Sequence, residues 1–196
     1  QKGSPADGRK ISAGDRLVRI NGHKIYDVLD YKFYSYDKRL KVELGRKTVK
    51  IKKEEGEDLG LVFETYLMDK QRRCANNCIF CFIDQNPKGM RESIYFKDDD
   101  SRLSFLFGNY ITLTNLTERD VERILEMHIS PVNVSVHTMN KELRVHMMKN
   151  KNAGKVLSYL DKIKEAGLTM RAQIVLCKGV NDGDELLYSM RRLVEY

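Results

Sequence analysis

The sequence has no tryptophan, only three prolines and only four cysteines in 196 residues. No apolar run approaches the roughly 18–20 residues that a membrane-spanning helix needs. The N-terminal segment lacks the pattern of basic residues, apolar stretch and small-residue cleavage site, so we expect no secretory leader. The few cysteines are clustered, which is not typical of a secreted disulfide framework. We therefore expect a protein of the reducing cytoplasm.

The composition indicates a folded protein with a hydrophobic core. Hydrophobic residues make up 41% of the chain and charged residues 32%, which excludes a disordered polyelectrolyte and a membrane bundle. The length allows one or two domains. The chain begins with Gln1 and stops at Tyr196 inside an expected helix, so we expect a fragment of a longer protein.

The net charge of +7 is concentrated in the N-terminal part, where residues 1–73 carry 18 Lys and Arg against 12 Asp and Glu. A basic chain raises the question of nucleic-acid binding. Much of the excess lies in short alternating pieces such as Lys50, Lys52 and Lys53, a pattern typical of a solvated sheet face. The sequence has no nucleic-acid recognition motif in which aromatic and basic residues are combined. We therefore disfavour nucleic acid as a partner.

Residues 1–58 form the first expected domain, rich in turns and short strands. Alternation and turn residues predict strands at 16–20, 40–44 and 48–52, a turn at Asn21-Gly22 and a helix at 27–38. The run from Gly14 to Gly22, Gly-Asp-Arg-Leu-Val-Arg-Ile-Asn-Gly, resembles the bacterial type of PDZ domain. The opening strand and glycine-rich loop of that domain are missing here. The resemblance implies a truncated PDZ-like fold with a peptide as its partner.

Residues 59–196 form the second expected domain, after a charged break at residues 54–58. Strands alternate here with helices, which predicts parallel βαβ units and an α/β fold. The expected strands are residues 60–67, 109–114, 131–137 and 169–176, and the expected helices are residues 117–127, 153–166 and 184–196. Active sites of such sheets gather at the carboxyl ends of the strands, and the cysteine cluster follows the first expected strand.

Three cysteines form a compact loop motif. Cys74, Cys78 and Cys81 have the spacing C-x3-C-x2-C, with Phe80 directly before the third cysteine. Three close thiolates suit a soft transition metal or an iron–sulfur cluster. A structural zinc site requires four ligands, and no fourth Cys or His lies nearby. An iron–sulfur cluster held by three thiolates would leave one iron open to a small molecule, whereas ordinary electron-transfer clusters use four.

This motif, after a strand of a βα series, resembles that of the radical S-adenosylmethionine superfamily. The resemblance implies that Cys74, Cys78 and Cys81 bind a 4Fe–4S cluster and that Phe80 lies against the adenine of S-adenosylmethionine. It further implies reductive cleavage of S-adenosylmethionine to a 5′-deoxyadenosyl radical that abstracts hydrogen from a substrate. A reductant such as flavodoxin or ferredoxin would supply the electron.

A narrower resemblance rests on the PDZ-like part, on the run Cys-Ala-Asn-Asn-Cys-Ile-Phe-Cys-Phe-Ile-Asp-Gln and on residues 95–105. The chain is similar to the bacterial PDZ-containing iron–sulfur oxidoreductases. The resemblance to this family implies no established substrate, so the substrate can be a small molecule or a protein. It implies an N-terminal PDZ-like domain followed by a partial (β/α) barrel, with four of the six βα units of the family barrel.

Polar residues near the expected strand ends are candidates for cofactor binding. Leu113-Thr114-Asn115 stands where many relatives have Gly-Gly-Glu, so Thr114 and Asn115 become candidates, although a helix-entry turn explains them equally well. Alternation places Ser135 and His137 on a polar strand face, and Gln173 in the next strand. A hydrogen-bonded structural role for His137 stays open.

Two further features are expected to be structural. Cys177 is expected to be a small buried residue rather than a ligand. The run Asp98-Asp99-Asp100 is expected to be a solvated loop, because it lacks the glycine and distal glutamate of a calcium loop.

Two alternatives to the radical enzyme stay open. One is a PDZ-type binding or scaffold module whose cysteine loop holds a structural zinc ion. The other, motivated by the positive charge, is a radical enzyme that modifies RNA.

Overall fold

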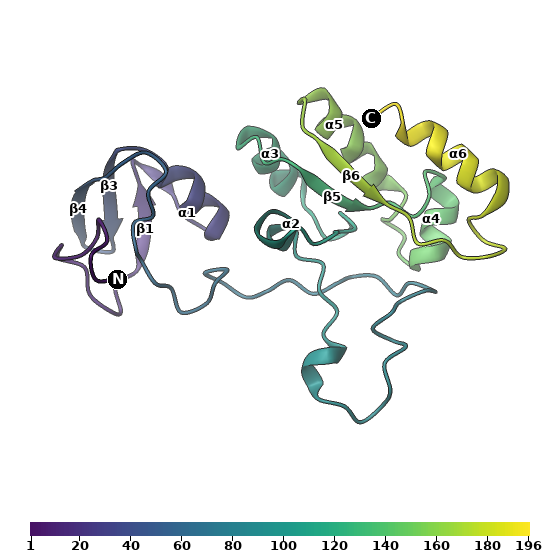
Figure 1. The fold of residues 1–196 in the computed structure, drawn as a ribbon, viewed down its shortest axis with the longest axis horizontal. Coiled ribbons are helices and arrows are strands. Elements are labelled where there is room, and N and C mark those ends of the chain that lie inside the picture. The colour runs from purple at the N-terminus through teal and green to yellow at the C-terminus, as the bar shows by residue number, and fades with distance from the viewer. The chain divides into compact units, whose positions relative to one another are not determined.

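The computed structural model describes all residues 1–196, which form two compact units, Gln1–Lys70 and Gln71–Tyr196 (Figure 1). Each unit has a hydrophobic core of its own. The division falls beyond the charged break at residues 54–58, because Leu59 and Leu67 are still buried and Leu59 belongs to the first core. None of the helices has the length and apolar composition needed to cross a membrane.

Unit 1 is a four-stranded antiparallel sheet with one helix. Its strand order is β2-β1-β3-β4, and its elements are β1 (Leu17–Ile20), β2 (His23–Lys24), α1 (Val28–Tyr34), β3 (Arg39–Leu44) and β4 (Lys47–Lys52). Asn21 and Gly22 both have positive φ, 52° and 88°, as a two-residue hairpin turn requires. Asp27 caps α1 through its side chain. The strands expected in this part are thus confirmed, and the expected helix is present but ends at Tyr34 rather than at Lys38.

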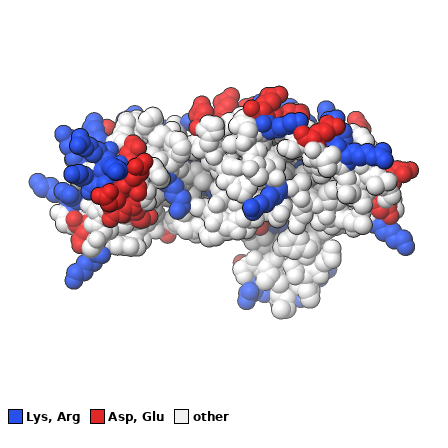
Figure 2. All heavy atoms as spheres, turned by 45° about the horizontal axis from the view of Figure 1, so that its top comes forward, with Lys and Arg blue, Asp and Glu red and all other residues white.

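The sheet of unit 1 separates an apolar face from a charged one. Leu40, Val42 and Leu44 of β3 are buried in the first core, while the alternate positions point away from it. Lys50 and Lys52 are exposed, which confirms the solvated face, and Figure 2 shows Lys and Arg side chains gathered over unit 1. Lys53 differs: it is buried, and its Nζ donates to the carbonyls of Tyr36 and Glu54.

Residues 60–67 do not form the strand that their apolar content predicts. The segment has no strand pairing, and Gly60 and Met68 at its ends have positive φ, 73° and 67°. Leu61 and Phe63 pack against the core of unit 1 instead. The prediction was wrong because short apolar runs do not by themselves determine a sheet partner, and here Leu61 and Phe63 are partly buried against the first unit while Val62 is exposed.

Unit 2 contains a parallel strand pair surrounded by helices. β5 (Val132–Ser135) pairs with β6 (Met170–Gln173), and Figure 1 shows α3 and α5 alongside the pair. The helices are η1 (Glu92–Tyr95), α2 (Ser101–Phe107), α3 (Glu118–Glu126), α4 (Lys141–Met148), η2 (Lys155–Leu157), α5 (Ser158–Glu165) and α6 (Gly183–Leu193). Apolar side chains of α3, η2 and α5 form one core around the fully buried β5.

The sheet of unit 2 is smaller than the four strands expected. Residues 109–114 contribute a single parallel bridge, between Ile111 and Val134, rather than a strand. Leu113 has a φ of 65°, and this left-handed conformation ends the extended segment directly after the bridge. The parallel arrangement of this segment with β5 and β6 agrees with the α/β expectation, while the number of strands was overestimated.

The helices of unit 2 are partly as expected. Thr117 and Asp120 form a reciprocal capping box at the start of α3. The helix expected at residues 153–166 begins later, at Ser158, after the 3-10 turn η2. Gly154 lies against α4, and a Cβ at this position would be 2.8 Å from the carbonyl oxygen of Lys141. The helices α2 and α4 were not predicted.

Candidate functional site

The cysteine loop is fixed to unit 2 by backbone hydrogen bonds on both sides of Cys78. The amides of Asn77 and Ile79 donate to the carbonyls of Met148 and Met147, at 3.0 and 2.9 Å, at the end of α4. Earlier in the loop, the amide of Cys74 donates to the carbonyl of Lys97 at 2.9 Å. The loop therefore lies against the carboxyl-terminal end of α4, and no strand precedes it.

Asn76 connects the cysteine loop to the segment that precedes α3. Its Nδ2 donates to Thr112 Oγ1 at 2.9 Å and to the sulfur of Cys74 at 3.4 Å. Its Oδ1 accepts from Thr114 Oγ1 at 3.0 Å and from Asn150 Nδ2 at 2.8 Å. All donors and acceptors of this buried amide are used. Sequence reasoning missed this role, although an asparagine between the first two cysteines of the motif was the signal.

The three thiols of the loop are half-buried and interact with one another. Burial, followed by the charges of Cys74 and Cys81, raises the pKa of Cys78 to about 11. Burial also raises the pKa of the Cys74 thiol. The structure contains no group of three or more His, Cys, Asp or Glu side chains arranged to hold a metal ion. The donor set fits a thiolate-bound iron cluster by its chemistry, because a bound cation would reverse the mutual repulsion of these sulfurs.

The structure brings Phe80 to the carboxyl end of β5, where it contacts His137. The two ring centroids are 4.6 Å apart in an edge-to-face arrangement. His137 is buried, and its Nδ1 accepts a hydrogen bond from the amide of Val175 at 3.2 Å. Burial and the charge of Arg144 lower the pKa of His137 to about 4. The imidazole is therefore neutral at pH 7, with its proton assigned to Nε2.

Thr114 and Asn115 lie beside the cysteine loop, but their side chains bond to protein groups. Thr114 Oγ1 donates to Asn76, and Asn115 Nδ2 donates to the carbonyls of Asp99 and Arg73 at 2.9 and 3.3 Å. In this structure both side chains position the loop. Their prediction as cofactor contacts stays a prediction.

Ser135 and Gln173 meet across the parallel strand pair. Ser135 Oγ donates to Gln173 Oε1 at 3.4 Å, and the two residues are register partners. Ser135 is buried, whereas Gln173 is exposed on β6. The two candidates therefore lie together near His137, at the end of the strand pair that faces the cysteine loop.

Three non-glycine residues around the cysteine loop have left-handed backbone conformations. Leu113, which follows Thr112, has a φ of 65°. His137, after the end of β5, has a φ of 66°, and Lys149, at the end of α4, has a φ of 46°. Such conformations cost of order 1–3 kcal/mol each and are concentrated at functional sites. Lys149 is the C-cap of α4, where a left-handed residue is a common helix ending, while Leu113 and His137 lie at or beside residues that contact the cysteine loop.

Two structural expectations were wrong. Asp99 and Asp100 are buried rather than solvated: Asp99 accepts from the amide of Thr112 at 2.7 Å, and Asp100 forms an ion pair with Arg102 at 2.6 Å. Cys177 is only half-buried, because it lies in the open turn after β6. Both errors arise because burial in loops depends on tertiary packing, which local polarity does not report.

Arg144 of α4 is a functional candidate that the sequence did not reveal. Its side chain is fully buried, and its guanidinium donates to the carbonyls of Val136, Ser135 and Thr112 at 2.9 Å each and to the carbonyl of Ala153. No carboxylate forms an ion pair with it. Burial lowers the pKa of Arg144 to about 10, so it stays charged at pH 7.

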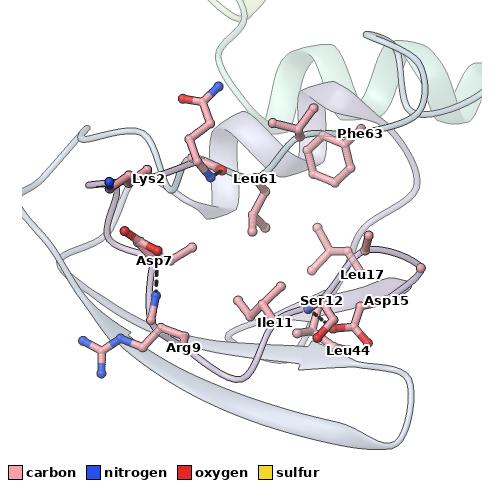
Figure 3. A pocket seen from close by; sticks show the side chains of 17 residues that line it. Lys2, Asp7, Arg9, Ile11, Ser12, Asp15, Leu17, Leu44, Leu61 and Phe63 are labelled. Carbon is pink, nitrogen blue, oxygen red and sulfur yellow. Dashed lines mark hydrogen bonds between the residues drawn. The ribbon is translucent and has the colours of Figure 1, made fainter.

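Unit 1 has a cavity of about 470 Å³ lined only by residues between Gln1 and Phe63 (Figure 3). Ile11, Leu17 and Leu61 point into it. Lys2 and Arg9 lie at its edge, while Asp15 is occupied by an ion pair with Lys47. None of the residues that line the cavity belongs to the cysteine loop.

Comparison with known families identifies the second unit. A model of the radical SAM-like domain matches residues 53–196, well over half of the chain. The chain belongs to the radical SAM-like domain family. No curated protein and no solved structure shows a significant match to the chain. Membership in the radical SAM-like family gives an enzyme as the functional class, and the matched range includes the cysteine loop and every other candidate residue described above.

Proposed function

We propose that the chain is a radical S-adenosylmethionine enzyme in which Cys74, Cys78 and Cys81 bind a 4Fe–4S cluster. The observation that carries the proposal is a loop with three half-buried, mutually interacting thiols, fixed at the carboxyl end of a parallel strand pair within a radical SAM-like domain. The reaction class is hydrogen abstraction from a substrate by an oxidoreductase.

When bound, the cluster and S-adenosylmethionine supply one-electron cleavage of the sulfonium, which yields a 5′-deoxyadenosyl radical. The protein's part is to bind, to position and to exclude water. Asn76 holds the loop in place and donates to the sulfur of Cys74, which favours the thiolate form. Phe80 provides an aromatic face for the adenine beside His137, whose neutral imidazole offers an Nε2 donor. Ser135 and Gln173 offer a hydroxyl and an amide for the polar part of the cofactor.

Anaerobic reconstitution tests the proposal. The chain is incubated with ferrous iron and sulfide, then given S-adenosylmethionine and dithionite, and 5′-deoxyadenosine is measured by chromatography. We expect a brown protein with four irons and four sulfides, and 5′-deoxyadenosine only when cluster, S-adenosylmethionine and reductant are all present. One equivalent of tightly bound zinc with no cluster would overturn the proposal in favour of the scaffold alternative.

Single cysteine variants sharpen this test. Cys78→Ala is expected to lose the cluster, because two thiolates and an open third position do not hold it. Cys177→Ala is the matched control, since Cys177 lies on a separate turn, and we expect full cluster content from it. Full cluster occupancy in Cys78→Ala contradicts the ligand assignment.

We also propose that unit 1 is a PDZ-like domain that binds a peptide in the cavity of Figure 3. Support comes from the β1–turn–β2 motif and from apolar side chains beside two cations, Lys2 and Arg9, which suit an apolar residue next to a carboxylate. Fluorescence polarisation with peptides that end in an apolar residue tests this. Binding weakened at least tenfold by Arg9→Glu supports the proposal, and an absence of binding across the peptide set overturns it.

A further inference from the structure

The most unusual charge in unit 2 is the buried guanidinium of Arg144. Burying an isolated cation is costly, and buried charges normally have a charged partner. Arg102, the other fully buried arginine, has such a partner in Asp100, at 2.6 Å. Arg144 instead donates to four backbone carbonyls, those of Thr112, Ser135, Val136 and Ala153. Its hydrogen bonds are satisfied, but its positive charge has no ion-pair partner.

The position of Arg144 relates this charge to the cysteine loop. Arg144 lies on α4, whose last carbonyls, from Met147 and Met148, accept the amides on both sides of Cys78. Two groups face the charge of Arg144 across the interior: the carboxyl of Asp99 interacts with it more strongly, and the thiol of Cys78 less strongly. In a low-dielectric interior such an interaction is screened far less than one at the surface.

A second cation near the loop differs in kind. Lys97 lies by Cys81, but it is partly exposed and its Nζ forms an ion pair with Asp84 at 2.6 Å. Solvent and the carboxylate therefore offset much of its effect on the loop. Arg144 differs in being fully buried and in forming no ion pair, although the carboxyl of Asp99 faces it.

We propose that Arg144 is a positioning residue whose buried charge complements an anionic thiolate-bound cluster at Cys78 and raises the cluster's reduction potential. The inference rests on the proposed function. A cluster held by three thiolates gains one further negative charge when it accepts one electron from an external one-electron reductant. A fixed positive charge stabilises the reduced form more than the oxidised form, and so the potential rises. The four carbonyl bonds keep the charge in place.

The test is the midpoint potential of the reconstituted cluster, measured in anaerobic dye-mediated titration with dithionite. Arg144→Gln removes the charge and is expected to shift the potential to more negative values. Arg144→Lys keeps the charge, loses part of the hydrogen bonding, and is expected to stay close to the wild-type potential. Lys162→Gln is the matched control, because it removes one positive charge from a half-exposed ion pair of the same unit, and no shift is expected.

The possible results separate this inference from the proposed function. Absence of a cluster in the wild-type chain overturns both. A cluster in Arg144→Gln with the wild-type potential overturns this inference alone. A shift in Arg144→Lys as large as the shift in Arg144→Gln also overturns it, because geometry rather than charge would then be responsible. A folded Arg144→Gln chain without a cluster supports the inference if Arg144→Lys binds one at the wild-type potential. Loss of the cluster in both variants assigns Arg144 a structural role only and overturns it.

Discussion

Asp99 provides a quantitative test of the buried polar network behind the cysteine loop. Its carboxylate accepts hydrogen bonds from the amide and the hydroxyl of Thr112, and only 3% of the residue is exposed. Burial raises the pKa of Asp99 from its usual 3.8 to about 6, although the Thr112 hydrogen bonds and the charge of Arg144 act in the opposite direction. Asp99 therefore binds its proton more tightly in the folded chain than in the unfolded chain.

The sign and size of the effect follow from linkage. Between pH 3.8 and pH 6 the folded state holds more protons than the unfolded state, so the free energy of unfolding falls as the pH rises through this range. A shift of about two pKa units corresponds to roughly 3 kcal/mol, at about 1.4 kcal/mol per unit. The stabilisation is complete below the unfolded pKa and is lost as the pH passes the folded one.

Asp99→Asn removes this titration while keeping the size of the side chain. The measured quantity is the difference in unfolding free energy between the wild type and the variant. We expect this difference to fall by roughly 3 kcal/mol as the pH rises from about 3.5 to about 7.5. Subtraction cancels the contribution of every other titrating group. Urea unfolding with hydrogen-exchange pulse labelling of β5 in the metal-free chain reports on unit 2 without interference from unit 1.

Asp98→Asn is the control for the change in net charge, because it removes an exposed carboxylate from the same loop. Parallel pH profiles for the wild type and Asp99→Asn would refute the reasoning. They would mean that the folded chain ionises Asp99 as readily as the unfolded chain does, and that burial in this network carries no electrostatic penalty.

Three other substitutions test the packing around the loop, each by urea unfolding of unit 2 at pH 7. Asn76→Ala leaves its buried partners Thr112 and Thr114 with fewer hydrogen bonds and should cost roughly 2–3 kcal/mol, and an unchanged midpoint would contradict its connecting role. Asp100→Asn takes the carboxylate from the buried guanidinium of Arg102 and should cost roughly 3–5 kcal/mol, whereas a loss below about 1 kcal/mol would show that solvent reaches this pair. Gly154→Ala places a Cβ 2.8 Å from a backbone carbonyl oxygen of α4 and should cost roughly 1–3 kcal/mol, and equal stability would mean that α4 moves freely.

Local patterns predicted local structure well. The alternation in β3 and β4 and the two-residue turn at Asn21-Gly22 depend on residues close in sequence, and the structure contains both. The same patterns failed for residues 60–67, because an apolar run can be buried by any neighbouring core. The alternation that predicts a strand at 109–114 also failed, because Leu113 adopts a left-handed conformation that no local signal announces.

In the candidate site, too, local motifs were predictable and contacts between distant segments were not. The spacing of Cys74, Cys78 and Cys81, taken together with the expected βα context, carried the resemblance to the radical S-adenosylmethionine superfamily, while the cluster itself stays a prediction. Phe80 was singled out as an adenine contact because it stands next to Cys81 in the motif, and that contact stays a prediction. Its observed contact with His137 was not predictable from the sequence. The partners of Asn76 outside its own loop come from two distant segments of the chain, residues 112–114 and Asn150, so no spacing rule relates them.

The sequence by itself determined the family, the place of the cysteine loop and the strands of unit 1, because each depends on residue types at short fixed spacings. Tertiary structure decided which polar groups are buried. Asp99, Asp100 and Arg144 look like ordinary charged surface residues in the sequence, yet the fold removes all three from water. That difference has a physical reason: the free energy of a charge depends on everything packed around it, and those neighbours are assembled only when distant segments meet.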